Sequence, residues 1–226
     1  PCCTNMELTT TALALTKAGH GEWWDMIDRH FRNHTLACQF TDPTAVNTGY
    51  VKGKTYSYDD TRDILNRSVG GFSWATAREH LFGSEELMLC CGGNAMWTLG
   101  KIATNAATLD DKVLSINLHF SLDTPLARIT SFEPFEGKLE VIPRHRGRVR
   151  IRKPSFSTKI LAKIDGAEVT PKDDGTYLAF RTLPARSTIV LHYAMPEKTS
   201  EETTYSTQGK DCFDTKSDPI LKERIQ

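Results

Sequence analysis

The pattern of apolar and polar residues divides the chain into a helical first half and a strand-rich second half. Apolar residues at three- and four-residue spacing predict helices over 6–18, 22–39 and 94–107. Gly19 follows the first helix where a left-handed C-cap is expected. The second helix carries an apolar stripe made of Trp23, Trp24, Ile27 and Phe31. Because the link at 20–21 is short, the first two helices are expected to pack as antiparallel neighbours.

Between the second and third helices, the pattern over 41–83 is weak. Pro and Gly residues interrupt it, and only 59–65 is compatible with a short helix. Irregular segments of this length in compact proteins are usually functional or disordered.

Beyond residue 110, apolar and polar residues alternate in short runs. These runs lie at 113–120, 138–142, 148–152, 159–164, 176–180 and 188–193. Short strands separated by Pro, Gly and Asp are typical of an antiparallel β-sandwich. We therefore expect an α + β multidomain chain with a helical domain over 1–110 and a sandwich over 111–196. Residues 197–226 are polar and are expected to form a tail or linker.

The charge balance argues against a broad polyanion-binding surface. The 226 residues include 28 Lys and Arg and 28 Asp and Glu, so the formal net charge is zero. The basic run at 144–153 alternates with Val149 and Ile151, as in a strand with one solvated face. No apolar run approaches the roughly 20 residues that a membrane span needs. We expect neither nucleic acid nor a membrane as a partner.

Cysteines give the first indication of chemistry. Six are present: Cys2, Cys3, Cys38, Cys90, Cys91 and Cys212. Four of them form two vicinal pairs, and adjacent cysteines join each other only with strained geometry. A chain of this length can also build a core without disulfides. Thiols kept reduced for metal binding or catalysis therefore fit better than a disulfide framework.

Both vicinal pairs precede predicted helices. Cys90 and Cys91 are followed by Gly92 and Gly93, and a helix N-terminus stabilises a thiolate. Such a cysteine is suited to be a nucleophile or a soft metal ligand. Two small buried hydrophobic residues under a helix cap are the alternative. If the other pair meets this one, three or four thiolates would suit zinc.

A second arrangement of ligand types lies on the second helix. His30, His34 and Cys38 fall at positions i, i+4 and i+8, one face that is in principle able to hold a metal. The edge of a core helix is the favoured interpretation, because both histidines flank the apolar stripe at Phe31.

Several motifs match one known pattern. Residues 1–6 (PCCTNM) stand where that pattern has Glu-Ser/Thr-Cys opening a helix, and residues 28–33 (DRHFRN) match an Arg-x-x-x-Asn helix. Residues 90–94 (CCGGN) match Cys-Cys-Pro-Pro-Asn. Stretches at 116–120, 149–156 and 164–166 match sandwich strands. Over about residues 1–196 the sequence resembles the C-terminal part of the bacterial β-L-arabinofuranosidases of glycoside hydrolase family 127.

The resemblance implies the C-terminal part of an (α/α)6 helical barrel followed by a β-sandwich. It also implies a retaining mechanism in which a zinc-bound cysteine thiolate is the nucleophile, with zinc held by one Glu and three Cys. Carried over, Cys90 is nucleophile and ligand and Cys91 is a ligand. The third sulfur is Cys2 if a Glu precedes Pro1, or Cys3 if Pro1 itself replaces the Glu.

The match is not complete. Gly92 and Gly93 replace two prolines, which loosens the turn that carries the thiols. The acid/base Glu of the family lies upstream of the matched region, so we expect this chain to be the C-terminal portion of a longer enzyme and to be inactive alone. A half-barrel of three long helices should also leave apolar surface uncovered.

Two classes of function follow from these observations. The first is a retaining glycoside hydrolase that acts on L-arabinofuranosides or similar plant-derived oligosaccharides, with Zn as its cofactor and a homodimer as one option for assembly. The second is a non-catalytic or structural carbohydrate-associated protein that keeps the fold without activity. The location is left open, with a bacterial cytoplasmic one favoured by the resemblance and the reduced thiols. Because the N-terminus at Pro1 need not be native, no targeting prediction is made from it.

Overall fold

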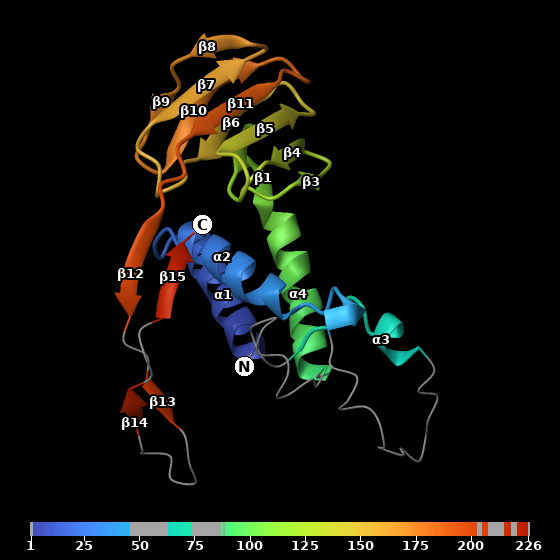
Figure 1. Cartoon of the computed structure of the whole chain (residues 1–226). Coiled ribbons are helices and arrows are strands. Elements are labelled where there is room, and N and C mark those ends of the chain that lie inside the picture. Colours follow the sequence, from blue (N-terminus) through green and yellow to red (C-terminus); the bar gives the residue numbers. More distant parts are fainter. Residues whose placement is uncertain are drawn as a thin grey trace.

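The computed structural model describes residues 2–45, 63–73, 87, 89–202, 205–207, 215–217 and 221–225. A β-sandwich lies at one end of a group of helices, and the last helix leads directly into the first strand (Figure 1). The helical elements are α1 (Cys2–Lys17), α2 (Trp24–His30), the π-helical turn η1 (Phe31–Thr35), the 3-10 turns η2 (Leu36–Cys38) and η3 (Pro43–Ala45), α3 (Ile64–Arg67) and α4 (Leu89–Ala106).

The first helix begins earlier than its apolar spacing predicts and ends where predicted. After α1, Gly19 adopts a φ of 77°, a left-handed conformation that glycine tolerates best. The backbone N–H of His20 donates to the carbonyl oxygen of Leu15 at 2.9 Å, which closes a Schellman cap. The short link then reverses the chain, and α1 packs against both α2 and α4.

The second predicted helix is not regular throughout. It starts at Trp24, and its hydrogen bonding changes to the π pattern in η1 and to the 3-10 pattern in η2. The short helix expected at 59–65 corresponds to α3, while 59–62 lie outside the described residues.

The third long helix also starts before its predicted residue. Because α4 begins at Leu89, Cys90 and Cys91 lie inside its first turn rather than ahead of it. Gly92 and Gly93 lie ahead of the predicted helix start at 94, but the helix runs through both.

The faces of the helices differ from those that spacing alone indicated. In α1 the buried residues are Cys2, Met6, Thr9, Ala12 and Leu13. The apolar spacing puts Leu8, Ala12 and Leu15 near one face of α1, but Leu8 and Leu15 are exposed. Met96 and Trp97 of α4 are exposed as well. As expected for a partial helical domain, the helices leave apolar surface uncovered.

Two sheets form the sandwich. Their strands are β1 (Ala107–Asp110), β2 (Val113–Ile116), β3 (Leu122–Asp123), β4 (Ala127–Ser131), β5 (Lys138–Pro143), β6 (Gly147–Arg152), β7 (Ile160–Ile164), β8 (Ala167–Val169), β9 (Lys172–Asp173), β10 (Tyr177–Leu183) and β11 (Ile189–Tyr193). One sheet has the order β1-β2-β6-β10-β9 and the other β3-β4-β5-β11-β7-β8. All pairs in these two sheets are antiparallel except β2 and β6, whose parallel pairing departs from the expected antiparallel sandwich.

Alternate residues of both sheets point inward and form one apolar core. Ile116 and Ile151 from one sheet meet Leu139, Val141 and Leu191 from the other, and all five are fully buried. Close packing requires a glycine at position 137. A Cβ there would lie 1.9 Å from the carbonyl oxygen of Tyr193, so no larger residue fits.

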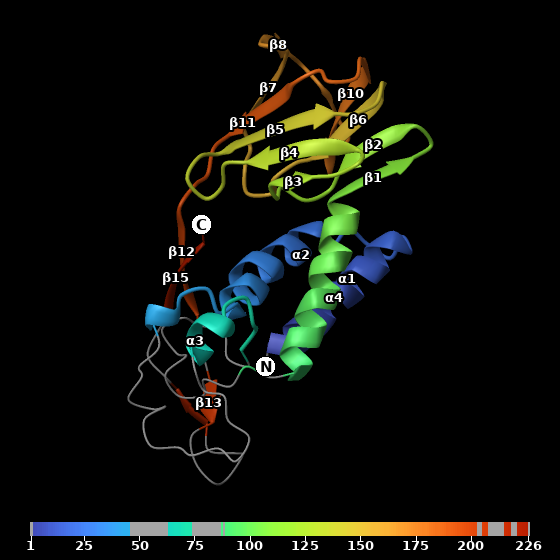
Figure 2. The ribbon, with the colours of Figure 1, turned by 90° about the vertical axis from the view of Figure 1, so that its right-hand side faces the viewer.

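The change from helix to strand falls between Ala106 and Ala107, before the residue 110 that the sequence indicated. Within the segment expected to be a tail or linker, the structure describes the strands β12 (Lys198–Glu202), β13 (Tyr205–Thr207), β14 (Thr215–Ser217) and β15 (Leu221–Ile225). The β12–β15 ribbon extends from the sandwich toward the helices (Figures 1 and 2).

Candidate metal centre

Five cysteines gather at the end of the helical group that is remote from the sandwich. Potential metal-ligand atoms there fall into two groups, each with all its atoms within 4.8 Å of one another. We call Cys3, Cys90 and Cys91 the three-thiol cluster, and Cys2, His34 and Cys38 the histidine cluster. The sequence predicted that the two vicinal pairs converge, and both clusters join α1 to a helix distant in sequence.

The three-thiol cluster fits zinc. The Sγ atoms of Cys90 and Cys91 lie 3.9 Å apart, and two sulfurs bound tetrahedrally at about 2.3 Å from one zinc ion would lie about 3.8 Å apart. The described cysteines are all free thiols. The Cys3 sulfur lies within 4.8 Å of both. Three thiols have the softness that zinc prefers, and they would leave a fourth position for another ligand.

Exposure and protonation differ within this cluster. Cys90 is exposed, Cys3 is half-buried and Cys91 is fully buried. Burial, together with the neighbouring thiols, raises the pKa of Cys91 to about 11. A coordinated cation reverses this effect, because a ligating thiol is deprotonated. The first turn of α4 adds free N–H groups that favour a thiolate.

The histidine cluster replaces the single-helix arrangement that the sequence offered as an alternative. His34 and Cys38 do meet, but their third partner is Cys2 of α1. His30 instead makes a 2.6 Å hydrogen bond between its Nδ1 and the Oδ1 of Asn5. Cys2, which the sequence offered as one choice for the third zinc sulfur, thus belongs to the histidine cluster, and Cys3 lies with Cys90.

Burial and the proximity of the two thiols set protonation in the histidine cluster. Burial lowers the pKa of His34 to about 4, so the imidazole is neutral near pH 7. Interaction with the Cys38 thiol, together with burial, raises the pKa of Cys2. The same interaction lowers the pKa of Cys38. Neutral imidazole and thiolate are the forms that bind metals.

A network of charges joins the helices to the sandwich, and sequence reasoning missed it. Arg152 of β6 was expected on a solvated face, but its side chain is only 4% exposed. It pairs with Asp25 and with Asp28 of α2, the latter at 2.7 Å. Arg32 in turn contacts Asp28 at 2.6 Å and Glu133 at 3.0 Å. The spacing of Asp25, Asp28 and Arg32 along one helix face was the available signal.

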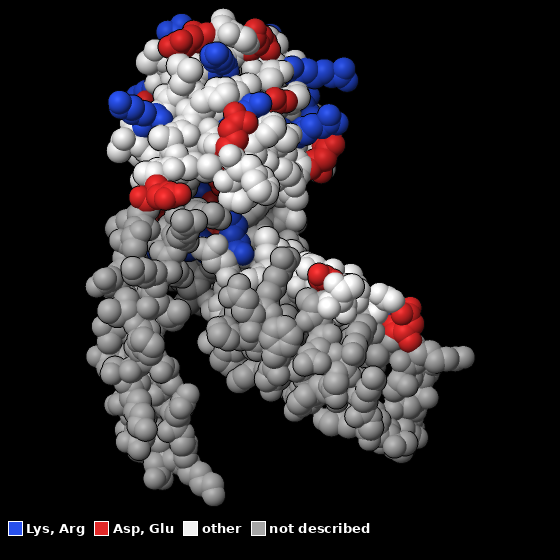
Figure 3. Space-filling model, viewed as in Figure 1, with Lys and Arg blue, Asp and Glu red and all other residues white. Residues whose placement is uncertain are grey.

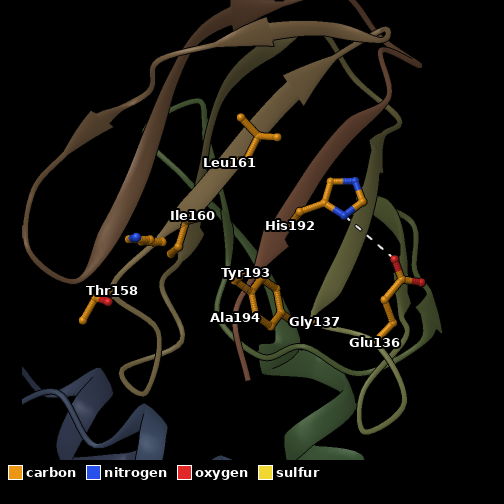
Figure 4. A pocket seen from close by; sticks show the side chains of 9 residues that line it. Glu136, Gly137, Thr158, Ile160, Leu161, His192, Tyr193 and Ala194 are labelled. Carbon is orange, nitrogen blue, oxygen red and sulfur yellow. Dashed lines mark ion pairs between the residues drawn. The ribbon is translucent and has the colours of Figure 1, made fainter. Parts of the chain in front are cut away.

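Two hollows accompany these features. The charge network borders a cavity of about 270 Å³ between α2 and the sandwich. An open hollow of about 650 Å³ lies on the sandwich beside β11, where His192 faces Glu136 with 3.9 Å between Nδ1 and Oε1 (Figure 4). Neither hollow is lined by a cysteine of the two clusters.

The visible surface of the sandwich carries both signs of charge. Lys and Arg side chains are interspersed with Asp and Glu on the face that Figure 3 shows. Among the described residues, no helix combines the length and the hydropathy needed to cross a membrane.

Comparison with known proteins gives matches at the level of structure. No protein-family model and no curated protein matches the sequence. A solved structure described as a glycoside hydrolase matches with a TM-score of 0.54 and 18% identity, over 97% of this chain and 35% of that one. The two share a fold.

Two further solved structures are more distant. A GH127 β-L-arabinofuranosidase from Geobacillus stearothermophilus T6 matches with a TM-score of 0.49 and 15% identity, over 89% of this chain and 31% of that chain. A GH127 β-arabinofuranosidase matches with a TM-score of 0.39 and 12% identity, over 60% and 25%. The chain thus spans between 25% and 35% of the length of these structures.

Proposed function

We propose that the chain belongs to a retaining glycoside hydrolase that acts on L-arabinofuranosides or similar glycans and uses a zinc-bound cysteine as its nucleophile. The observation that carries the proposal is the three-thiol cluster, in which Cys3, Cys90 and Cys91 converge from α1 and α4. The fold shared with a solved glycoside hydrolase and the resemblance of residues 1–196 to family 127 support the same conclusion.

Cys90 is the best placed nucleophile of the three. Its thiol is exposed, so a sugar can reach it, whereas Cys91 is fully buried. Cys3 and Cys91 would hold zinc together with Cys90. When bound, zinc supplies positive charge that keeps these thiols deprotonated near neutral pH.

The chemistry of a thiolate nucleophile proceeds in two displacements. The Cys90 sulfur forms a bond to the anomeric carbon while the bond from that carbon to the leaving oxygen breaks, and the leaving oxygen takes a proton from a general acid. Water then attacks the same carbon, gives its proton to the conjugate base and releases the Cys90 thiolate. Because the cluster contains thiols alone, the acid has to come from another part of the enzyme.

We also propose that α1, α2 and α4 form part of an (α/α)6 barrel. Leu89, Met96 and Trp97 of α4 are 94%, 66% and 61% exposed. Further helices packed against this surface would bury these apolar side chains, whose burial stabilises the fold by about 25 cal/mol per Å². The thiols would then lie at one end of the barrel, with Cys90 open to its interior.

The proposal is tested by hydrolysis of a nitrophenyl β-L-arabinofuranoside by the full-length protein. Cys90→Ser should abolish turnover, because a serine hydroxyl is not readily ionised at neutral pH. Cys91→Ser should lower turnover mainly through weaker zinc binding, so that added zinc restores part of the rate. Thr182→Ser, at an exposed position of the sandwich, is the control and should leave turnover unchanged.

Zinc content and trapping give the second measurement. An arabinofuranose-configured epoxide should label Cys90, and the labelled peptide should be absent from the Cys90→Ser protein. Unchanged turnover in Cys90→Ser would overturn the assignment of the nucleophile. A folded, zinc-loaded protein without activity on any arabinofuranoside would favour the non-catalytic carbohydrate-associated alternative.

A further inference from the structure

We propose that Cys2, His34 and Cys38 form a second binding site for a thiophilic divalent cation such as Zn²⁺, distinct from the three-thiol cluster. The proposed nucleophile is not part of this site, so the proposal does not depend on the hydrolase activity.

The three candidate ligands lie in different elements. Cys2 opens α1, His34 lies in the π-helical turn η1, and Cys38 ends the 3-10 turn η2. Their ligand atoms all lie within 4.8 Å of one another. Two thiols and one imidazole are the donor set that zinc takes in proteins, while harder cations such as Mg²⁺ prefer oxygen.

Burial separates this cluster from a chance grouping on the surface. Cys2 and Cys38 are 0% and 1% exposed. The Nε2 atom of His34 is buried and has no hydrogen-bond partner among the residues that the structure describes. A buried polar atom without a partner is costly and rare. A cation bound through Nε2 would give this nitrogen the partner that it lacks.

The backbone around His34 is also unusual. Short π-helical segments inside helices are rare and occur frequently at functional sites. Here the π pattern covers Phe31–Thr35 and is followed directly by the 3-10 turn Leu36–Cys38. These two changes in helix geometry lie where His34 and Cys38 approach Cys2. His30 lies in the regular part of the helix and is hydrogen-bonded to Asn5 instead.

A cation in this site would fix the first turn of α1. Cys2 directly precedes Cys3, so a bond from Cys2 to a cation also restrains the Cys3 thiol of the other cluster. We therefore assign the site a structural role that positions Cys3.

The test is the zinc content of the full-length protein after reduction, loading with Zn²⁺ and removal of unbound metal. Cys38→Ser and His34→Asn should each bind about one zinc fewer than the wild type. The Cys90→Ser/Cys91→Ser variant should lose a different equivalent, so that combining it with Cys38→Ser removes about two. His20→Asn, which removes an exposed histidine outside both clusters, is the control and should change nothing.

Cobalt gives a second readout that does not depend on activity. In the Cys90→Ser/Cys91→Ser protein, bound Co²⁺ should still show a thiolate charge-transfer band, and that band should disappear when Cys38 is also replaced. Circular dichroism establishes that each variant is folded. An unchanged zinc content in both Cys38→Ser and His34→Asn would overturn the proposal, as would a Cys2–Cys38 disulfide in the protein purified without reductant.

Discussion

Arg152 of the sandwich and Asp28 of α2 form an ion pair of 2.7 Å between Nη2 and Oδ2. The guanidinium also donates from Nε to the carbonyl oxygen of Asn117 at 2.6 Å. The side-chain amide of Asn117 donates in turn from Nδ2 to the carbonyl oxygen of Asn105 near the end of α4 at 2.9 Å. The buried guanidinium of Arg152 thereby links α2 and α4 to two segments of the sandwich.

We expect Arg152→Ala to lower the free energy of unfolding by about 2–3 kcal/mol, since removal of one partner of a buried pair leaves the other uncompensated. The loss should stay below the largest values known for buried pairs, because Asp28 keeps Arg32 as a partner. Urea unfolding measures the change. Arg148→Ala, on the same strand but exposed, should change stability by no more than about 0.5 kcal/mol. Equal losses in the two variants would contradict the role assigned to Arg152.

Glu133 makes the stability of this junction depend on pH. Burial opposes ionisation of its carboxyl group, but the His119 imidazole, whose Nδ1 lies 3.8 Å from Oε1, the hydrogen bond from Tyr193 and the charge of Arg32 prevail and hold its pKa below the usual value. A lowered pKa in the folded state stabilises the protein above the ordinary pKa of glutamate. This contribution is lost as the pH falls through the lowered folded-state pKa.

Glu133→Gln should therefore reduce the free energy of unfolding at pH 7 and flatten its decline between about pH 5 and 3. Urea midpoints measured at several pH values test this. Glu136→Gln alters an exposed carboxylate three residues further on and should keep the acid dependence of the wild type. An equally steep decline in Glu133→Gln would show that other groups control acid unfolding.

Much of the fold follows from local patterns in the sequence. The strands β5, β6, β7, β10 and β11 lie close to the predicted alternating runs, and Gly19 ends α1 as expected. Strand β1 was missed because Ala107–Asp110 continues directly from a helix without a turn signal. The parallel pairing of β2 with β6 was missed because alternation specifies which face a residue occupies, not which strand lies beside it.

The candidate site was less predictable. Convergence of the thiols could be expected because both pairs lie at helix N-termini. Which of Cys2 and Cys3 lies with Cys90 depends on how the first turn of α1 is rotated about the helix axis. The burial of Arg152 required knowing that α2 covers the end of β6. Neither a helix rotation nor a contact between distant elements is specified by local spacing.

The two glycines in the first turn of α4 give a further prediction. Gly93 is exposed and a Cβ there would meet no atom within 4 Å. Gly93→Ala should therefore stabilise the protein by about 0.5 kcal/mol, since alanine restricts the unfolded chain and favours the helix. Gly19→Ala is the matched contrast. Its Cβ would also meet open space, but the φ of 77° should make that replacement cost about 1 kcal/mol. Thermal unfolding should show a gain in stability for Gly93→Ala and a loss for Gly19→Ala. Destabilisation by Gly93→Ala would contradict the helical conformation of this turn.

Alkylation of the metal-free protein tests the distinction between Cys90 and Cys91. Cys90 is exposed and should react first with iodoacetamide at pH 8. Cys91 should react slowly for two reasons: it is fully buried, and a pKa of about 11 leaves little thiolate at that pH. Because the two residues are adjacent, fragment-ion sequencing of the peptide has to assign the label.

In urea the two alkylation rates should become similar, which separates the effect of burial from the intrinsic reactivity of each thiol. Prior addition of zinc should protect Cys90, since a coordinated thiolate is a weaker nucleophile toward the reagent. If Cys91 is labelled as fast as Cys90 in the folded protein, the exposed and buried roles assigned to them are wrong.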